Sequence, residues 1–184
     1  MDITKGIFTT PVYPGDPEPE LVRICDRAEG DEINLSVIKA CVHTGTHVDS
    51  PSHYLDRGVT VEKLPLEHFI GPCKVISCNG IVSYDLISQV QMDGCRILLI
   101  KGDVKLDEGI CMGLLDKNIA TIGVEVETIG DGNVHRAVLG KNIAVIENLD
   151  LSQIKEGKYF LFAPPVKIEG GEGAFVRAVL IEGL

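Results

Sequence analysis

Short apolar segments rich in valine and isoleucine recur along the chain, and this pattern constrains the fold more than any other feature. Each segment has the length of a β-strand and is bounded by Gly, Asn or Asp, which favour turns. Short segments with helical patterning lie between several of them. Because strands that alternate with helices build layered domains, the pattern predicts an α/β fold with a mostly parallel sheet.

The expected strands outnumber the expected helices, so a second, smaller sheet stacked on the first would take up the surplus. We expect a loop rich in Thr, Gly, Ser and Pro at residues 44–58. The expected helices cover residues 83–90, with Ser83 as the N-cap, 111–117 and 134–139. The expected strands cover residues 21–26, 33–42, 73–78, 96–101, 119–124, 143–146, 159–162 and 175–181.

One domain accommodates the whole chain. Its 184 residues fall within the usual size of a domain and are enough to bury a core without disulfide bonds. Prolines at positions 11, 14, 17 and 19 restrict the backbone and remove hydrogen-bond donors. We therefore expect a single domain over residues 1–184, with residues 1–20 as an N-terminal arm on its surface.

The charge of the chain excludes two classes of partner. There are 27 acidic and 17 basic residues, a net charge of −10, whereas nucleic acids and anionic membranes select basic patches. No apolar stretch approaches the ~20 residues that span a bilayer, and the first residues lack the apolar segment of a signal peptide. We expect a cytoplasmic protein that acts on a small molecule.

The six cysteines agree with that compartment. No two of them form a Cys-x-x-Cys pair, which argues against a thiolate zinc finger or a thioredoxin-type motif. Four of them lie beside strand-forming apolar residues, so we expect free thiols that pack as small hydrophobic side chains.

Histidine carries the chemistry in this sequence. Three of the five histidines fall within eleven residues, in the run His43-Thr-Gly-Thr-His47-Val-Asp49-Ser-Pro-Ser-His53. Imidazole and carboxylate ligands together suit Zn, Mn or Fe(II). Burying such a cluster without a metal or mutual pairing would be expensive. The spacing therefore predicts a metal site.

Local composition favours an extended backbone at this site. A helix would also bring His43 and His47 to one face, but Thr, Gly, Val and Pro are poor helix formers. In an extended strand end, His47 and Asp49 point to the same side. Gly45 allows a tight turn that lets His43 converge on them, and the neighbouring threonines can orient the ligands.

Two kinds of metal site fit these residues. A structural zinc site is normally closed by four ligands and often uses cysteine. The oxygen-rich ligand set beside a Ser/Pro loop favours an open, catalytic site instead. His135, in the expected third helix, and Glu147, at the carboxyl edge of an apolar strand, are further candidates. His68 has no companion and is expected to be structural or exposed.

The run from His43 to His53 resembles the core motif of the metal-dependent cyclase family, which includes bacterial kynurenine formamidase (an arylformamidase) and isatin hydrolase. The resemblance extends over nearly the whole chain, with Tyr13 where the family has Trp. The outer motifs that carry it are Tyr13-Pro-Gly-Asp16-Pro, Val61-Glu-Lys-Leu-Pro-Leu66, Gly102-Asp103, His135 followed by Glu147-Asn-Leu149, and Pro165 to Ala178.

The resemblance implies a fold, a reaction and a set of roles. The fold would be a three-layer β/β/α domain of the swivelling type. The reaction would be hydrolysis of an amide-type C–N bond, as in N-formylkynurenine or a related formamide or cyclic amide, by metal-activated water. One or two Zn or Mn ions would bind per chain, in a dimer or tetramer. The implied ligands are His43, His47 and Asp49 for one ion and Asp49, His135 and Glu147 for a second, with His53 as general acid and base.

Two rival functions fit part of the pattern. His47, Asp49 and His135 match the two-histidine, one-carboxylate triad of non-haem Fe(II) oxygenases, which would leave His43 and Glu147 without a role. A non-catalytic module that binds a metal or a small molecule is the other rival. It would have no use for His53, because pure binding needs no general base.

Overall fold

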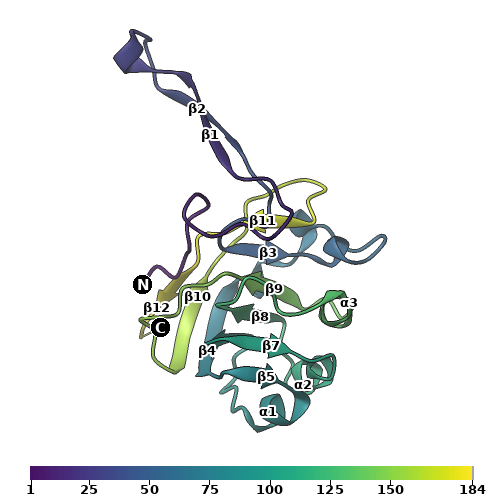
Figure 1. The fold of residues 1–184 in the computed structure, drawn as a ribbon. Coiled ribbons are helices and arrows are strands. Elements are labelled where there is room, and N and C mark those ends of the chain that lie inside the picture. Colours follow the sequence, from purple (N-terminus) through teal and green to yellow (C-terminus); the bar gives the residue numbers. More distant parts are fainter. Residues whose placement is uncertain (184) are drawn as a thin grey trace.

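An eight-stranded sheet forms the centre of the protein in the computed structural model, which describes residues 1–183 (Figure 1). Its strand order is β11-β3-β9-β8-β6-β4-β10-β12. The strands are β3 (His47–Asp49), β4 (Ile70–Ser77), β6 (Ile97–Lys101), β8 (Thr121–Val124), β9 (Ala144–Glu147), β10 (Gly157–Phe162), β11 (Gly173–Phe175) and β12 (Val179–Ile181).

Only the middle of this sheet is parallel. Strands β4, β6, β8 and β9 pair in parallel, whereas β3 and β11 on one side and β10 and β12 on the other pair antiparallel. The expectation of a mostly parallel sheet is therefore wrong for the flanks. Each parallel pair is joined through one of the three helices, whereas each antiparallel pair joins strands that are not consecutive in the chain, such as β3 with β9 and β4 with β10, so no crossover helix sets their direction.

Three short helices cover one face of the sheet. They are α1 (Tyr84–Gln89), α2 (Ile110–Asp116) and α3 (Gly132–Leu139), within a few residues of the predicted ranges. Alternate residues of β6 pack on opposite faces of the sheet. Leu98 and Ile100 pack toward the helices, and Ile97 and Leu99 pack on the other side. Ser83 lies at the N-cap of α1, but its side chain makes no capping hydrogen bond.

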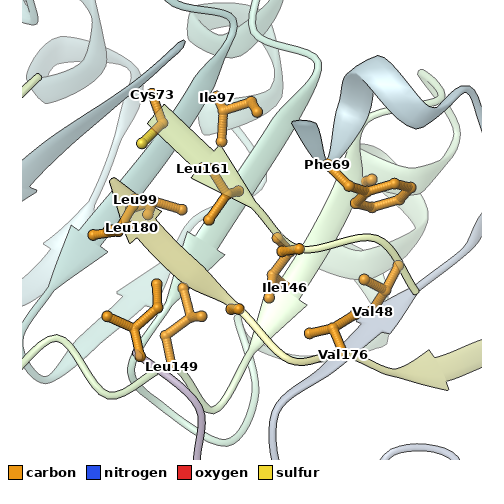
Figure 2. Packing of buried hydrophobic residues seen from close by; sticks show 14 of the residues in the cluster. Val48, Phe69, Cys73, Ile97, Leu99, Ile146, Leu149, Leu161, Val176 and Leu180 are labelled. Atoms are coloured by element: carbon orange, nitrogen blue, oxygen red, sulfur yellow. The ribbon is translucent and has the colours of Figure 1, made fainter. Parts of the chain in front are cut away.

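The opposite face is covered by the curled end of the same sheet. Leu161 of β10 and Leu180 of β12 join one apolar cluster with Leu99 of β6 and Ile146 of β9 (Figure 2). A separate second sheet is thus not needed to account for the surplus of strands, because the curled sheet itself supplies the second β layer. The expected α/β fold class is confirmed.

The curl also explains the largest error in the predicted elements. Residues 175–181 were expected to form one strand, but the structure contains β11 and β12, which lie at opposite edges of the sheet. The chain leaves one edge at Phe175 and pairs with the other edge from Val179, since the curl brings the edges close enough for a short connection. Near this connection, Asp2 of the N-terminal arm forms a bridge with Val179.

Two further strand pairs lie outside the large sheet. A small parallel pair, β5 (Gly80–Val82) and β7 (Val104–Leu106), was not anticipated from the sequence. An antiparallel hairpin, β1 (Glu20–Cys25) and β2 (Leu35–Lys39), matches predicted strands and projects away from the body (Figure 1). Single 3₁₀ turns complete the elements: Arg27–Glu29, Pro51–His53, Val61–Lys63 and Leu66–His68.

Residues 1–183 contain all six cysteines and the three helices described above. All six cysteines are free; Cys73, Cys95 and Cys111 are buried, and the other three are partly exposed. None of the helices in this part of the chain has the length and apolar character required to cross a bilayer.

Candidate metal centre

Strand β3 brings three candidate ligands together. Its residues His47 and Asp49 are two apart and lie within reach of each other, with His47 Nε2 3.3 Å from Asp49 Oδ1. The strand pairs with β9 so that His47 stands directly opposite Glu147. As a result Glu147 Oε2 is 3.5 Å from His47 Nε2, although 100 residues separate the two in sequence.

A tight turn carries His43 back to the same point. Gly45 has a φ of +68°, a conformation that strongly favours glycine, as its place in the motif predicted. His43 Nδ1 lies 2.9 Å from Asp49 Oδ1. Thr46 fixes the turn, because its hydroxyl donates to Asn148 O and accepts from Lys5 N. The hydroxyl of Thr44 is buried and has no hydrogen-bond partner in the structure, so only Thr46 plays the expected orienting role.

Helix α3 supplies His135. Asp131 caps the helix by accepting from the backbone N–H groups of Asn133 and Val134. Its carbonyl lies 3.0 Å from His135 Nδ1, so that nitrogen donates and leaves Nε2 free toward the cluster. His135 Nε2 is 3.3 Å from Glu147 Oε1 and 3.6 Å from Asp49 Oδ2.

The ring of His47 is held in the same way as that of His135. Its Nδ1 donates to the carbonyl of Gly45 over 2.9 Å, and its Nε2 faces the two carboxylates. A backbone acceptor that holds one ring nitrogen and presents the other is the usual support of a metal-binding histidine.

His53 lies at the edge of the cluster, in the 3₁₀ turn after β3. Its ring stacks on that of His43, with centroids 4.1 Å apart and an interplanar angle of 28°. Tyr54 follows it and stacks on His135 at 4.5 Å. All six predicted site residues therefore converge, and His68 lies elsewhere, packed beside Phe69.

Two buried polar atoms in the cluster lack any hydrogen-bond partner: His43 Nε2 and Asp49 Oδ2. Leaving a carboxylate oxygen unpaired inside a protein is costly. Ligand atoms of His47, Asp49 and Glu147 lie within 4.8 Å of one another, and so do those of His43, Asp49 and His53. An array of imidazole nitrogens and carboxylate oxygens with spare acceptor capacity fits a divalent metal.

The electrostatics of the cluster depend on its buried carboxylates. Burial alone would lower the pKa of His47, but its contacts with Asp49 and Glu147 raise it to about 10. Burial opposes the ionisation of Asp49, yet hydrogen bonds from His43 and His47 hold its pKa well below the usual range. His53 differs, because burial and the neighbouring His43 and His135 lower its pKa and together outweigh the carboxylates of the cluster, which raise it. His53 is therefore neutral near pH 7, whereas metal-free His47 is protonated.

Metal uptake is expected to release protons and to strengthen as the pH rises. With a pKa of about 10, His47 holds a proton at neutral pH, and only its neutral form can bind a metal. Each unit of pH below that value therefore makes the competing proton harder to displace. Calorimetric titration of the metal-free protein in buffers of different ionisation enthalpy measures the released protons. Metal binding that releases no proton and has the same affinity from about pH 6 to pH 8 would contradict this assignment.

A cavity of about 410 Å³ opens beside the cluster. Five predicted site residues line it: His43, His47, His53, His135 and Glu147. Tyr54 is the main omission, and its position next to His53 was the available signal. Cys41 and Glu127 also contribute, and Tyr13 and Asp16 of the N-terminal arm complete the rim. The arrangement can hold a small molecule against the histidines, with Tyr13 and Tyr54 among the lining residues.

Comparison with known proteins gives a consistent result. A family model described as "Putative cyclase" matches residues 1–103. Kynurenine formamidase of Salinibacter ruber is 30% identical over 203 aligned residues, which cover 98% of this chain and 96% of that relative.

Solved structures show the same fold. A "potential metal-dependent hydrolase with cyclase activity" superposes with a TM-score of 0.84 at 30% identity, covering 98% of this chain and 96% of the other. An isatin hydrolase bound to the product analogue thioisatinate superposes with a TM-score of 0.80, covering 98% and 90%. At 19% identity, the second likeness concerns the fold alone.

Proposed function

The chain belongs to the cyclase family, and on this basis we propose that it is a metal-dependent enzyme that hydrolyses an amide-type C–N bond outside peptides. The observation that carries the proposal is the convergence of four histidines and two carboxylates beside a cavity that all of them except Asp49 line. A purely structural site would be closed by its ligands, whereas this cluster faces an open space of about 410 Å³.

The proposed ligands are those named from the sequence. His43, His47 and Asp49 would hold one divalent ion, and Asp49, His135 and Glu147 would hold a second, with Zn or Mn as the metal. When bound, the metal supplies a water with a pKa lowered toward ~7 and an electrophile for the substrate carbonyl. The Nε2 atoms of His47 and His135 are already directed inward by their backbone acceptors.

His53 is the proposed proton carrier. It is half-buried and neutral near pH 7 because its surroundings lower its pKa. In that state it can accept the proton of the attacking water as the C–O bond forms. It then donates the proton to the nitrogen as the C–N bond breaks, so that an acid and an amine leave the site. Stacking on His43 holds the imidazole in place between these two transfers.

The cavity supports an aromatic formamide or a cyclic aromatic amide as substrate. Tyr13 and Tyr54 line it and offer faces on which a ring can stack. Asp16, Asp131 and Glu127 also line it and disfavour an anionic group beside them. We therefore expect N-formylated arylamines to be better substrates than aliphatic formamides.

Metal-dependent turnover of such compounds tests the proposal. Protein purified without chelator should contain one or two equivalents of Zn or Mn, measured by mass spectrometry. It should hydrolyse a panel of formanilides and cyclic imides. Stripping the metal should remove the activity, and adding the metal back should restore it. Protein that takes up no metal on reconstitution would overturn the proposal.

The same experiment separates the rival functions. An Fe(II) oxygenase that uses His47, Asp49 and His135 would consume oxygen in the presence of Fe(II) without hydrolysing the panel. A non-catalytic binding module would take up metal and leave the whole panel intact.

We also propose the compartment, the domain organisation and the oligomeric state of the protein. We place the enzyme in the reducing cytoplasm, where its six free thiols are stable. Residues 1–184 form one hydrolase domain, with residues 1–20 as its arm, and the working form is a dimer or tetramer.

A further inference from the structure

Another hollow lies at the other end of the parallel strands from the metal centre. It has a volume of about 230 Å³. Its lining includes residues that lead into three strands: Arg96 before β6, Ala120 before β8 and Ile143 before β9. Because these strands run parallel, the hollow lies at their amino ends, whereas Glu147 ends β9 at the metal centre. The hollow and the cavity beside the metal centre share no lining residue.

The titratable side chains that line this hollow are all basic. They are His68, Arg96 and Lys141, and no carboxylate lines it within residues 1–183. Neither Arg96 nor Lys141 forms an ion pair with an acidic side chain in that range. The chain has 27 acidic and 17 basic residues, so a hollow with basic groups alone departs from its overall charge. Such a local excess of positive charge favours an anion.

His68 adds an unpaired polar atom to the hollow. Its Nδ1 is buried and has no hydrogen-bond partner in the structure. The residue is fixed in place, because Thr121 Oγ1 donates to His68 O over 2.7 Å. Burial and the charge of Arg96 lower the pKa of His68 and outweigh Glu67, which raises it. The imidazole is therefore neutral near pH 7 and can carry its proton on Nδ1, where an acceptor is missing.

Arg96 and two asparagines complete the set of hydrogen-bond donors. Asn118 and Asn142 follow α2 and α3 and line the hollow, with φ of +54° and +57°, a conformation that asparagine tolerates. Arg96 Nε donates to Asn118 O over 3.4 Å, which holds the guanidinium beside this turn. Its two terminal amino groups make no hydrogen bond within residues 1–183. They can therefore bind a pair of oxygen atoms on one ligand.

The ends of two helices account for only part of this arrangement. Arg96 contacts the turn after α2, and Lys141 lies in the turn after α3. A positive charge is favourable beside the last carbonyl groups of a helix, which explains the two cations. It explains neither the unpaired Nδ1 of His68 nor the collection of donors from separate segments around one hollow.

We propose that this hollow binds phosphate, either free or as the phosphate group of a small molecule. A tetrahedral dianion has enough oxygen atoms to accept from Arg96, Lys141 and His68 together, whereas a carboxylate has only two. At about 230 Å³ the hollow is smaller than the roughly 300–1,000 Å³ of sites for larger ligands, which suits a single oxyanionic group. The inference goes beyond the proposed hydrolysis and does not depend on it.

Titration of the protein as purified with inorganic phosphate tests the proposal. Amide NMR shifts, recorded at constant ionic strength, report where the ion binds. The amides of residues 118–120 and 141–143 should shift and saturate, with a dissociation constant below about 10 mM. The amides of residues 45–49 report separately on any phosphate at the metal centre.

Two further probes identify the ligand class. Methyl phosphate that saturates the same amides assigns the site to phosphate monoesters as well as to the free ion. Methyl phosphate that fails where inorganic phosphate succeeds assigns it to the free ion. Acetate that binds as tightly as phosphate overturns the assignment to a dianion.

Variants of the lining residues should weaken the binding. Arg96→Gln and Lys141→Gln should each raise the dissociation constant at least about 10-fold, because each removes a charge-assisted hydrogen bond. His68→Leu removes the Nδ1 donor and should raise it at least about 3-fold. The matched control is Lys117→Gln, which removes one positive charge beside Asn118 without changing the lining, and its effect should stay below about 2-fold. Circular dichroism checks that each variant folds.

Each of these measurements reports binding alone, so it remains readable if the hydrolase proposal fails. The absence of saturable shifts at residues 118–120 and 141–143 overturns the inference. Equal weakening by Lys117→Gln and Lys141→Gln would show a diffuse attraction to positive charge in place of a site, and would overturn it too. Unchanged binding in His68→Leu would contradict the role given to the buried Nδ1.

Discussion

Asp49→Asn is expected to lose bound metal and, with it, hydrolysis. Asp49 contacts His43, His47 and His135 and is the one carboxylate shared by both proposed ion sites. Asparagine keeps the size of the side chain but removes the negative charge and one acceptor oxygen. Since changes to supporting residues alone cost about 10–100-fold in metal affinity, losing this ligand should cost more than 100-fold. Metal content after dialysis and the rate on a formanilide measure the effect.

The matched control is Glu172→Gln. Glu172 is a half-exposed carboxylate whose Oε1 is 3.8 Å from His43 Nε2, so it lies beside the cluster without belonging to the proposed ligand set. This variant should keep its metal. If Asp49→Asn also retained its full metal content, the assignment of Asp49 as a ligand would be wrong. If both variants lost metal, the set would have to include Glu172.

His53→Ala should lower turnover by roughly 10²-fold or more while metal content stays unchanged. A positioned general acid and base contributes about 10²–10⁴-fold to the rate, and His53 is the proposed group with a lowered pKa. The unmodified enzyme should lose activity as the pH falls through that pKa, below the usual 6.5, because the protonated imidazole cannot accept a proton. The variant should lack this acid limb. Rate profiles from about pH 5 to pH 9 measure both effects.

The structure makes metal content the essential second readout for this variant. Ligand atoms of His53, His43 and Asp49 lie within 4.8 Å of one another, so His53 has the geometry of a ligand as well as that of a base. Loss of metal in His53→Ala would reassign it as a ligand. Unchanged turnover would remove it from the mechanism. His68→Ala is the control, because that histidine lies beside Phe69, apart from the cluster.

Much of the fold could be predicted because most of its strands are apolar runs that can be recognised from neighbouring residues. Apolar runs such as 96–101 and 119–124 coincide with β6 and β8 to within two residues. Strands β5 and β7 were missed because each has only three residues, too short for a recognisable pattern, whereas β3 lies in the segment that was expected to be extended. The split of residues 175–181 was missed for another reason. Both halves have strand character, and only the curl of the sheet assigns them to different edges.

The part of the candidate site that is formed by residues close together in sequence could be predicted. His43, His47, Asp49 and His53 lie within one short run, and spacing alone placed the middle pair on one side of an extended segment. His135 and Glu147 were weak candidates by spacing, and the family resemblance singled them out. Tyr54 was missed although it follows His53, because adjacency to a site residue does not by itself distinguish a cavity wall from an ordinary surface tyrosine. Its stacking on His135 depends on where α3 packs.

The sequence by itself determined the α/β character, the family and the residue types of a metal site, because periodicity and motif spacing are properties of neighbouring residues. Only the tertiary structure decided that β3 enters between β9 and β11, which sets His47 opposite Glu147. It also decided that the sheet curls over its own face and that an apolar hairpin projects outward. These features arise from pairing and burial between segments distant in sequence, which local patterning does not encode.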